Sequence, residues 1–215
     1  MGRYAAVVFD LDGTLLDTLE DLAGSVNFAL EKHAGMTRSV GQIRSFIGNG
    51  VRMLMTRSLP GGQENPAFES AFADFREHYR DHCRDKTQPY PQIMDLVKEL
   101  SARGSKLAIV SNKADPEVKK LSREFFGGLI CSSVGEREGV ARKPAPDTLF
   151  ETLKEMGVAK QDAVYVGDSE VDVQTARNAG VDFIGVTWGF RSAEQLRQAG
   201  AQTLVSSPME LLSLA

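Results

Sequence analysis

The chain has 215 residues, 42% of them hydrophobic and 25% charged, and a formal net charge of −4 at pH 7. That is enough apolar material for a sizeable core, whereas the acidic balance argues against nucleic-acid or membrane partners, which require clustered positive charge. The two cysteines form no CxxC pair, so we expect free thiols rather than a zinc site or a disulfide framework. We see neither a signal-peptide pattern nor a run of about 18 apolar residues, which predicts a cytoplasmic protein.

The first expected element is a buried strand, the apolar run from Tyr4 to Val8, and two carboxylates follow it at Asp10 and Asp12. Residues two apart in a strand point to the same side, so these like charges lie close together if the strand continues. Burying either of them carries a cost of several kcal/mol, on the order of the penalty for an unpaired ion. A positive partner is therefore expected beside them.

The next part of the chain has a helical pattern. Asp17 and Glu20 resemble a capping pair, and apolar residues then recur at helical spacing as far as Leu30. Further helices are expected over 39–59 and 66–85, separated by the turn-rich stretch PGGQENP. Because no clear strand pattern appears, we expect an all-helical cap domain at 18–89, inserted directly after the first strand.

From Ile93 onward, short apolar runs alternate with helical segments, as in KLAIVSN, PEVKKLSREFF, AVYVGDS and VDVQTARNAG. Strands separated by helices of ten or more residues indicate parallel βαβ units, with a sheet that is covered on both faces. The opening strand belongs with this set. The sequence therefore predicts an α/β core domain made of residues 1–17 and 90–215.

Polar residues stand at the ends of the predicted strands, where ligands bind in open parallel sheets. They are Asp10, Asp12, Ser111, Asn112 and Asp168. Asp172 follows Asp168 by one helical turn, and Lys143 lies in RKPAPD before another helix. Carboxylates crowded together are ligands for a hard cation, and Mg²⁺ takes one or two carboxylates together with waters and a substrate phosphate. We therefore expect Mg²⁺ as the cofactor that makes the acidic cluster tolerable.

Four motifs carry a family resemblance, which covers essentially the whole chain. In order and approximate spacing, DLDGTLLDT, VSNK, RKPAPD and GDSEVD resemble the motifs of the haloacid dehalogenase-like superfamily, and GVTWGF is similar to a stretch of its phosphoglycolate phosphatase group. The resemblance implies a Rossmann-like core with a helical cap, and an enzyme that hydrolyses a small phosphorylated metabolite through an aspartyl-phosphate. Phosphoglycolate, pyrophosphate, a sugar phosphate or a nucleotide monophosphate remain open as substrates.

The same resemblance implies a role for each site residue. Asp10 is the nucleophile, and Asp12 is first the general acid and then the general base. Ser111 and Lys143 bind the transferring phosphoryl group, with help from backbone donors near Gly13 and Asn112. The implied metal ligands are the side chains of Asp10 and Asp168 and the main-chain oxygen of Asp12, with Asp172 as a further ligand or as a partner of one.

The alternatives to a phosphatase include an isomerase and a protein that is not an enzyme. A β-phosphoglucomutase-like isomerase uses the same aspartate pair, but its first motif has Val where Thr14 stands here, and its cap has a histidine a few residues beyond the Asp-Thr. In this chain Thr18 is followed by Leu-Glu-Asp. A non-enzymatic phosphoacceptor of the receiver type also combines acidic residues, Mg²⁺ and a lysine, but it needs no acid-base aspartate and no cap.

The predicted cap contains residues whose roles the sequence leaves open. The stretch Gly48-Asn49-Gly50 opens a helix, and its N–H groups could face a substrate or form a plain turn. Arg44 and Arg52 could meet a second anionic group, although solvated arginines are the default. The pair His78 and His82 has metal-ligand spacing, but the polar surroundings favour a solvated helix face.

Overall fold

In the computed structural model, residues 3–215 are described. The chain divides into two compact units, Met1–Leu16 with Pro89–Ala215, called here the core unit, and Asp17–Gln88, called the helical unit. Among the described residues, no helix is both long enough and apolar enough to cross a membrane. Both cysteines are free thiols, as expected, with Cys83 buried and Cys131 exposed.

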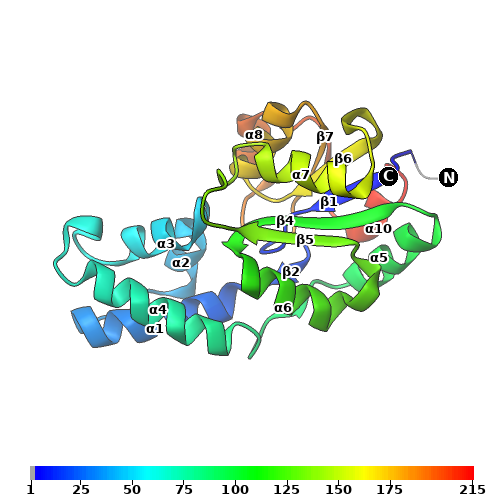
Figure 1. The fold of residues 1–215 in the computed structure, drawn as a ribbon. Coiled ribbons are helices and arrows are strands. Elements are labelled where there is room, and N and C mark those ends of the chain that lie inside the picture. Colours follow the sequence, from blue (N-terminus) through cyan, green and yellow to red (C-terminus); the bar gives the residue numbers. More distant parts are fainter. Residues whose placement is uncertain (1–2) are drawn as a thin grey trace. The chain divides into compact units, whose positions relative to one another are not determined.

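The core unit is built on a six-stranded sheet in the order β5-β4-β1-β6-β7-β8, and its paired strands run parallel (Figure 1). The strands are β1 (Ala6–Phe9), β4 (Lys106–Ala114), β5 (Ser132–Glu136), β6 (Ala163–Gly167), β7 (Asp182–Val186) and β8 (Leu204–Val205). The sequence order reverses beside β1, where β4 pairs on one side and β6 on the other. Ligands of open parallel sheets bind at such a reversal, beyond the carboxyl ends of the strands.

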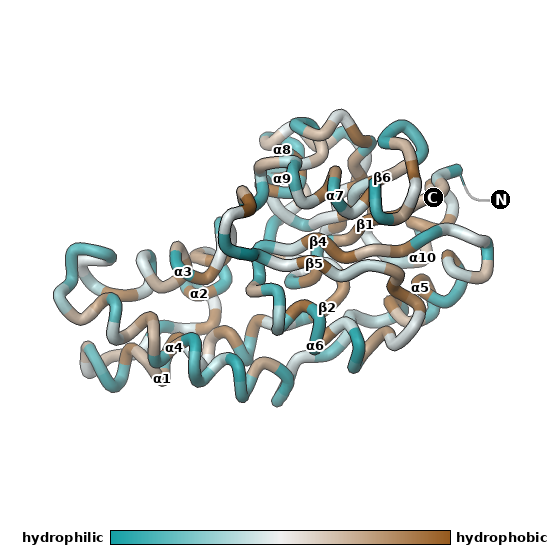
Figure 2. Tube along the Cα trace, in the orientation of Figure 1, coloured by the Kyte–Doolittle hydropathy of each residue, from teal (hydrophilic) through white to brown (hydrophobic). Residues whose placement is uncertain are grey.

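Helices cover both faces of this sheet, with α5 and α6 on one face and α7 and α8 on the other (Figure 1). The helices of the core unit are α5 (Ile93–Ala102), α6 (Asp115–Phe126), α7 (Asp147–Met156), α8 (Glu170–Ala179), α9 (Ala193–Ala199) and α10 (Pro208–Leu211), with 3₁₀ turns at Gly127–Leu129 and Lys160–Asp162. Because β1 is covered on both faces, its four residues are all apolar and buried. Figure 2 shows the hydrophobic residues concentrated in these central strands. The expected α/β class is confirmed.

The helical unit contains four α-helices, and α1 packs along α4. They are α1 (Leu19–Ala34), α2 (Val40–Phe46), α3 (Gly50–Ser58) and α4 (Phe68–His82), with a 3₁₀ turn at Gly62–Glu64. Short strands at the two ends of the unit, β2 (Leu16–Asp17) and β3 (Gln88–Pro89), form a two-stranded sheet that the sequence did not predict.

One local expectation was met in part and another was wrong. The stretch expected to be helical over 39–59 forms two helices, α2 and α3, and α3 begins at Gly50, as expected for Gly48-Asn49-Gly50. The positive φ angles of Gly48 and Asn49 interrupt the α-helical backbone between them. The capping pair at the start of α1 does not form. Thr18 is the N-cap residue without a side-chain cap bond, and Asp17 instead accepts a hydrogen bond from the Leu19 N–H at 3.3 Å.

Candidate active site

The carboxyl ends of β1 and β6 bring the acidic residues together. Asp10 directly follows β1, and its N–H donates to the Val166 carbonyl of β6 at 2.9 Å, so that Asp168 lies at the same end of the neighbouring strand. The first turn of α8 adds Asp172. One carboxylate oxygen from each of the three lies within 4.8 Å of the others. The structure therefore brings three of the predicted metal-site side chains into a single cluster.

Asp10 is almost completely buried, with 8% of the residue exposed. Its Oδ1 accepts from the Leu11 N–H at 2.7 Å and lies 3.0 Å from Lys143 Nζ. Burial raises the pKa of Asp10, the ammonium of Lys143 opposes this, and the charges of Asp172 and Asp12 add to the rise, for a pKa of about 6. In the absence of a further cation, Asp10 is therefore harder to ionise than an ordinary aspartate.

Lys143 is buried at the centre of the cluster. Its Nζ donates to Asp172 Oδ1 at 2.8 Å and to the Tyr165 hydroxyl at 2.9 Å, besides facing Asp10. Burial alone would lower the pKa of Lys143, but the charges of Asp10 and Asp172 outweigh it and hold this pKa well above its usual value. The ammonium is therefore a permanent positive charge. Asn112 secures the segment by donating from Nδ2 to the Lys143 carbonyl at 2.9 Å.

Asp172 is fully buried and is occupied on both of its oxygens. Oδ1 accepts from Lys143, while Oδ2 accepts from the Ser169 N–H at 3.0 Å and from the Ser169 hydroxyl at 2.6 Å. Ser169 and Asp172 form the capping box that starts α8. Through these contacts Asp172 holds Lys143 in place. Its expected role as a metal ligand, or as a partner of one, stays a prediction.

Asp168 is 1% exposed and is held by two donors from different loops. The Thr14 hydroxyl donates to Oδ1 at 3.0 Å, and the Phe190 N–H donates to Oδ2 at 2.7 Å. Burial raises the pKa of Asp168, and repulsion from Asp172 and Asp10 adds to it, so that this pKa lies well above its usual value. A cation placed among these oxygens would remove the repulsion.

The loop after β7 was missed as part of the site by the sequence reasoning. Besides the Phe190 N–H, it supplies Trp188, whose Nε1 donates to the Thr14 carbonyl at 3.0 Å. At Gly189 a Cβ atom would collide with the Gly13 carbonyl and the Asp168 side chain. The sequence GVTWGF entered the prediction only through the family resemblance. Its glycine, Gly189, is the local feature that could have indicated a close approach of the backbone to the site.

A second buried lysine was also missed. Lys113, on β4, places its Nζ 2.7 Å from Asp12 Oδ1. Only 2% of the Lys113 side chain is exposed, compared with 17% of that of Asp12. The positive partner that the two opening carboxylates require is thus provided separately for each, by Lys143 for Asp10 and by Lys113 for Asp12.

Ser111 and Gly13 also lie at this end of the sheet. Ser111 is 5% exposed and lies on β4. Ile109, two residues before it, is in register with Phe9, the last residue of β1. Gly13 adopts a φ of 84° in the turn after β1, a conformation that favours glycine, and its N–H donates to the Leu16 carbonyl at 2.9 Å.

The open cap residues belong to the helical unit. Arg52 forms an ion pair with Glu69, and its guanidinium lies 5.1 Å from the ring centroids of both Phe68 and Phe72. These contacts give Arg52 a packing role inside its own unit. Gly48 and Asn49 form the turn before α3, and Arg44 lies in the last turn of α2.

The histidines of α4 have partners within the helical unit. His78 faces the Ser25 hydroxyl at 3.0 Å and stacks on Phe28, and His82 lies 2.7 Å from Asp85. Among residues 3–215, the Asp10, Asp168 and Asp172 group is the one set of side chains whose geometry could hold a metal.

The donor set of this group fits a divalent cation of the hard type. All three side chains offer carboxylate oxygen, the preferred ligand of Mg²⁺ and Ca²⁺, and no sulfur or imidazole atom takes part. The raised pKa values of Asp10 and Asp168 point in the same direction, because they mark carboxylates with too little positive charge around them. Asp10 and Asp168 are the side chains that would hold the ion.

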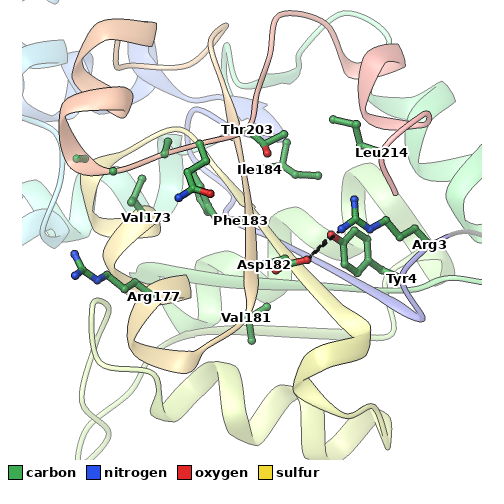
Figure 3. Close-up of a pocket in the computed structure, with 14 residues that line it drawn as sticks. Arg3, Tyr4, Val173, Arg177, Val181, Asp182, Phe183, Ile184, Thr203 and Leu214 are labelled. Atoms are coloured by element: carbon green, nitrogen blue, oxygen red, sulfur yellow. Dashed lines mark hydrogen bonds and ion pairs between the residues drawn. The ribbon is translucent and has the colours of Figure 1, made fainter.

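A separate pocket of about 700 Å³ lies at the opposite ends of the strands (Figure 3). Its lining includes Tyr4, which precedes β1, and Asp182 at the start of β7, and the Tyr4 hydroxyl donates to Asp182 at 2.6 Å. Figure 3 shows this pair beside Arg3. None of the acidic cluster lines this pocket, which is therefore separate from the candidate active site.

Comparison with known proteins supports the assignment of a family. A model of the haloacid dehalogenase-like hydrolases matches residues 7–186. Phosphoglycolate phosphatase of Chromobacterium violaceum is 33% identical, with 97% of this chain and 95% of that protein covered. Phosphoglycolate phosphatase 1 of Pseudomonas aeruginosa is 32% identical, with 97% and 79% covered.

A solved structure gives the same result. A provisionally named phosphoglycolate phosphatase of Lactobacillus delbrueckii subsp. bulgaricus superposes with a TM-score of 0.93 at 38% identity, covering 99% of this chain and 98% of that one. The chain therefore belongs to the haloacid dehalogenase-like hydrolases. Within that family it falls with the phosphoglycolate phosphatase group, and its activity is that of a phosphoric monoester hydrolase.

Proposed function

We propose that this chain hydrolyses a small phosphomonoester in a Mg²⁺-dependent reaction, with a phosphoenzyme formed on Asp10. The observation that carries the proposal is the arrangement at the carboxyl ends of β1 and β6, where Asp10 and Asp12 each face a different buried lysine and Asp168 stands beside them. The two buried lysine ammonium groups within the acidic cluster favour binding of a dianionic phosphate over a neutral substrate.

In the first step, Asp10 attacks phosphorus and the bond from phosphorus to the ester oxygen breaks. Both protein contacts described for the Asp10 carboxylate engage Oδ1, so Oδ2 is the attacking oxygen. Asp12 gives its proton to the leaving alkoxide as that bond breaks. This splits one difficult hydrolysis into two easier displacements.

In the second step, Asp12 removes a proton from water, and the water oxygen attacks the phosphorus of the aspartyl-phosphate. The bond between phosphorus and Asp10 breaks, which releases inorganic phosphate and restores the carboxylate. Lys143 and Ser111 bind the phosphoryl oxygens during both steps, with Asp172 and Tyr165 holding the Lys143 ammonium. Positioning and electrostatic stabilisation supply most of the catalysis in such transfers.

Asp10, Asp168 and the main-chain oxygen of Asp12 would hold Mg²⁺. When bound, the ion neutralises charge on the carboxylates and on the phosphoryl oxygens, which would otherwise repel each other. Thr14 and the Phe190 N–H keep Asp168 oriented for this role. Gly13 leaves room for the Asp168 side chain, because a Cβ at that position would collide with the Asp168 carboxylate.

For the substrate we propose a small phosphorylated acid of the phosphoglycolate type. Relatives that bear the name phosphoglycolate phosphatase, at 32% and 33% identity over almost the whole chain, support this choice over a sugar phosphate, pyrophosphate or a nucleotide. The Thr14 position, where the isomerase motif has Val, supports a hydrolase over a β-phosphoglucomutase-like enzyme.

The test combines a substrate panel with two variants. Phosphate release is measured for 2-phosphoglycolate and other small phosphomonoesters with Mg²⁺ and with excess EDTA, and we expect release with Mg²⁺ alone. Asp10→Asn should abolish turnover. Asp12→Asn should lower it by roughly 10² to 10⁴, while still accepting phosphate from p-nitrophenyl phosphate, whose leaving group needs little protonation.

Mass spectrometry of acid-quenched Asp12→Asn protein then locates the intermediate. One added phosphate on the peptide that contains Asp10 supports the mechanism. A phosphate on Ser111, or an initial burst that persists in Asp10→Asn, refutes it. Full activity in EDTA refutes the metal assignment, and conversion of one sugar phosphate into another without phosphate release refutes the hydrolase.

A further inference from the structure

The ion pair between Lys113 and Asp12 joins two residues that lie 101 positions apart in the sequence. Both belong to the core unit. The Lys113 side chain is almost completely buried, and its Nζ lies 2.7 Å from Asp12 Oδ1. Burying an ammonium group without a partner costs several kcal/mol, on the order of the desolvation penalty of an ion. The Asp12 carboxylate offsets this cost for Lys113.

The local structure of β4 positions this lysine. Ser111 and Lys113 stand two residues apart near the carboxyl end of the strand, and the register with β5 shifts between Val110 and Ala114. Such an irregularity bends a strand and changes the direction of its side chains. Gly135 of β5 permits it, because a Cβ there would collide with the backbone of Lys113 and Asp115.

The two lysines of the site face different members of the aspartate pair. Lys143 contacts Asp10 and Asp172 at 3.0 and 2.8 Å, whereas Lys113 contacts Asp12. We propose that Lys113 is a positioning residue, which orients the Asp12 carboxylate for proton transfer. The inference rests on the proposed function, in which Asp12 moves the protons.

The contact with Lys113 also determines which oxygen of Asp12 transfers the proton. Lys113 donates to Oδ1, so the protonated form of Asp12 carries its hydrogen on Oδ2, and Oδ2 is the atom that serves the leaving oxygen and then the water. A misplacement of about 1 Å in a catalytic group can lower a rate about 10²-fold. Removing Lys113 should therefore resemble a partial loss of Asp12 itself.

The experiment measures how Lys113→Met depends on the leaving group. Turnover of an alkyl phosphate such as 2-phosphoglycolate should fall about 10²-fold, in kcat more than in KM. With p-nitrophenyl phosphate the phosphorylation step should be nearly normal, and phosphoenzyme on Asp10 should accumulate because the second step still needs Asp12. Lys113→Arg, which keeps the charge, should restore part of the alkyl-phosphate rate.

A double-mutant cycle provides the decisive comparison. In an Asp12→Asn background, adding Lys113→Met should cause little further loss, because the group that Lys113 orients is already absent. Equal losses in the rate of the phosphorylation step for both substrates, or the same loss with and without Asp12, would overturn the proposal and leave Lys113 with a purely structural role. If the methionine variant does not fold, Lys113→Gln is used in its place for the same cycle.

The controls separate this inference from the proposed function. Lys119→Met removes an exposed lysine from the neighbouring helix α6, where it pairs with Asp115, and should leave both substrates unaffected. If Asp12→Asn itself shows no preference for activated leaving groups, the proposed function fails. If Asp12→Asn behaves as proposed and Lys113→Met does not resemble it, the failure is confined to Lys113.

Discussion

The core unit and the helical unit use charge in opposite ways. The core unit buries Asp10, Asp168, Asp172, Lys113 and Lys143, each at most 8% exposed, in a connected group. The helical unit places its ion pairs largely at the surface. Examples are Lys32 with Asp74, Arg52 with Glu69 and Lys86 with Glu20.

This difference separates chemistry from packing. Burial of charge costs free energy that a fold does not need to spend, so a concentration of buried, mutually paired charges marks the place where a reaction requires them. Among the charged side chains of residues 17–88, all of which are described, Asp21 is the buried one, and backbone N–H groups satisfy it. The following predictions test this contrast, beginning with the largest effect.

Replacing a glycine by alanine should be harmful at the site in the core unit and beneficial in the helical unit. Gly189→Ala places a Cβ against the Gly13 carbonyl and the Asp168 side chain, so phosphatase activity should fall by about 10² or more, as expected for displaced catalytic groups. Gly24→Ala lies inside α1 with nothing within 4 Å, and it should stabilise the protein by about 0.5–1 kcal/mol. Activity assays and thermal unfolding measure the two effects, and comparable activities would contradict the close packing at Gly189.

Metal removal should affect the core carboxylates alone. Saturation with Mg²⁺ at about 100 times its Kd should add about 2.7 kcal/mol to the free energy of unfolding, and EDTA should remove that gain. Asp168→Asn should abolish the Mg²⁺ effect. It should not destabilise the metal-free protein, because it removes a buried charge that repels Asp172 and Asp10.

Asp74→Asn is the matched control for that experiment. Asp74 faces Lys32 and His33 in the helical unit, and this variant should keep the full Mg²⁺ response. Thermal unfolding with and without Mg²⁺ measures both variants. A normal Mg²⁺ response in Asp168→Asn would place the ion elsewhere.

The sequence predicted the convergence of the site because that convergence follows from topology. Asp10, Ser111 and Asp168 each follow a short apolar run, and parallel strands bring their carboxyl ends to one edge. The α/β class could be predicted for the same reason. The chemical roles of these residues stay predictions until the variants are measured.

Other features depend on tertiary contacts that no local pattern specifies. The pairing of Lys113 with Asp12 joins β4 to the loop after β1, and a buried lysine in the string VSNK looks like any other lysine. The requirement for glycine at position 189 becomes visible only when the Gly13 carbonyl is beside it. The break between α2 and α3, by contrast, has a local signal in Gly48-Asn49-Gly50, the stretch that was expected to open a helix.

Removing Asp21, the buried charged residue of the helical unit, should lower stability substantially. The two oxygens of Asp21 accept from the Lys86 N–H at 3.0 and 3.1 Å and from the Thr87 N–H at 2.9 Å. Asp21→Ala leaves these buried donors without an acceptor, so the free energy of unfolding should drop by about 1–3 kcal/mol. Glu20→Ala, which removes the adjacent exposed partner of Lys86, should have a much smaller effect in the same denaturant titration.

The surface ion pair of Arg52 and Glu69 should contribute little. Both side chains are substantially exposed, at 42% and 72%, and such pairs contribute about 0.2–1 kcal/mol at low salt. Glu69→Gln should lower stability by an amount in that range, and added salt should reduce the difference from wild type. A loss of stability as large as that caused by Asp21→Ala would contradict the view that surface ion pairs contribute little in the helical unit.

The smallest effect concerns pH and His78, which is half-buried on α4. Burial lowers the pKa of His78 below its ordinary value of 6.5, the neighbouring His82 lowers it further, and Asp85 and Asp81 oppose them. The unfolded chain therefore binds a proton at this position more readily than the folded chain. Stability from this group is complete above pH 6.5 and is lost as the pH falls towards the lowered pKa.

His78→Gln should make this dependence disappear. The variant keeps a polar side chain for the Ser25 hydroxyl but cannot titrate, so between about pH 8 and about pH 5 its unfolding temperature should fall less than that of wild type. Comparing the two proteins cancels the acid sensitivity of every other group, the core carboxylates included. An equal decline in both would mean that His78 has the same pKa in the folded and the unfolded chain, and the pH dependence of stability would then arise from other groups.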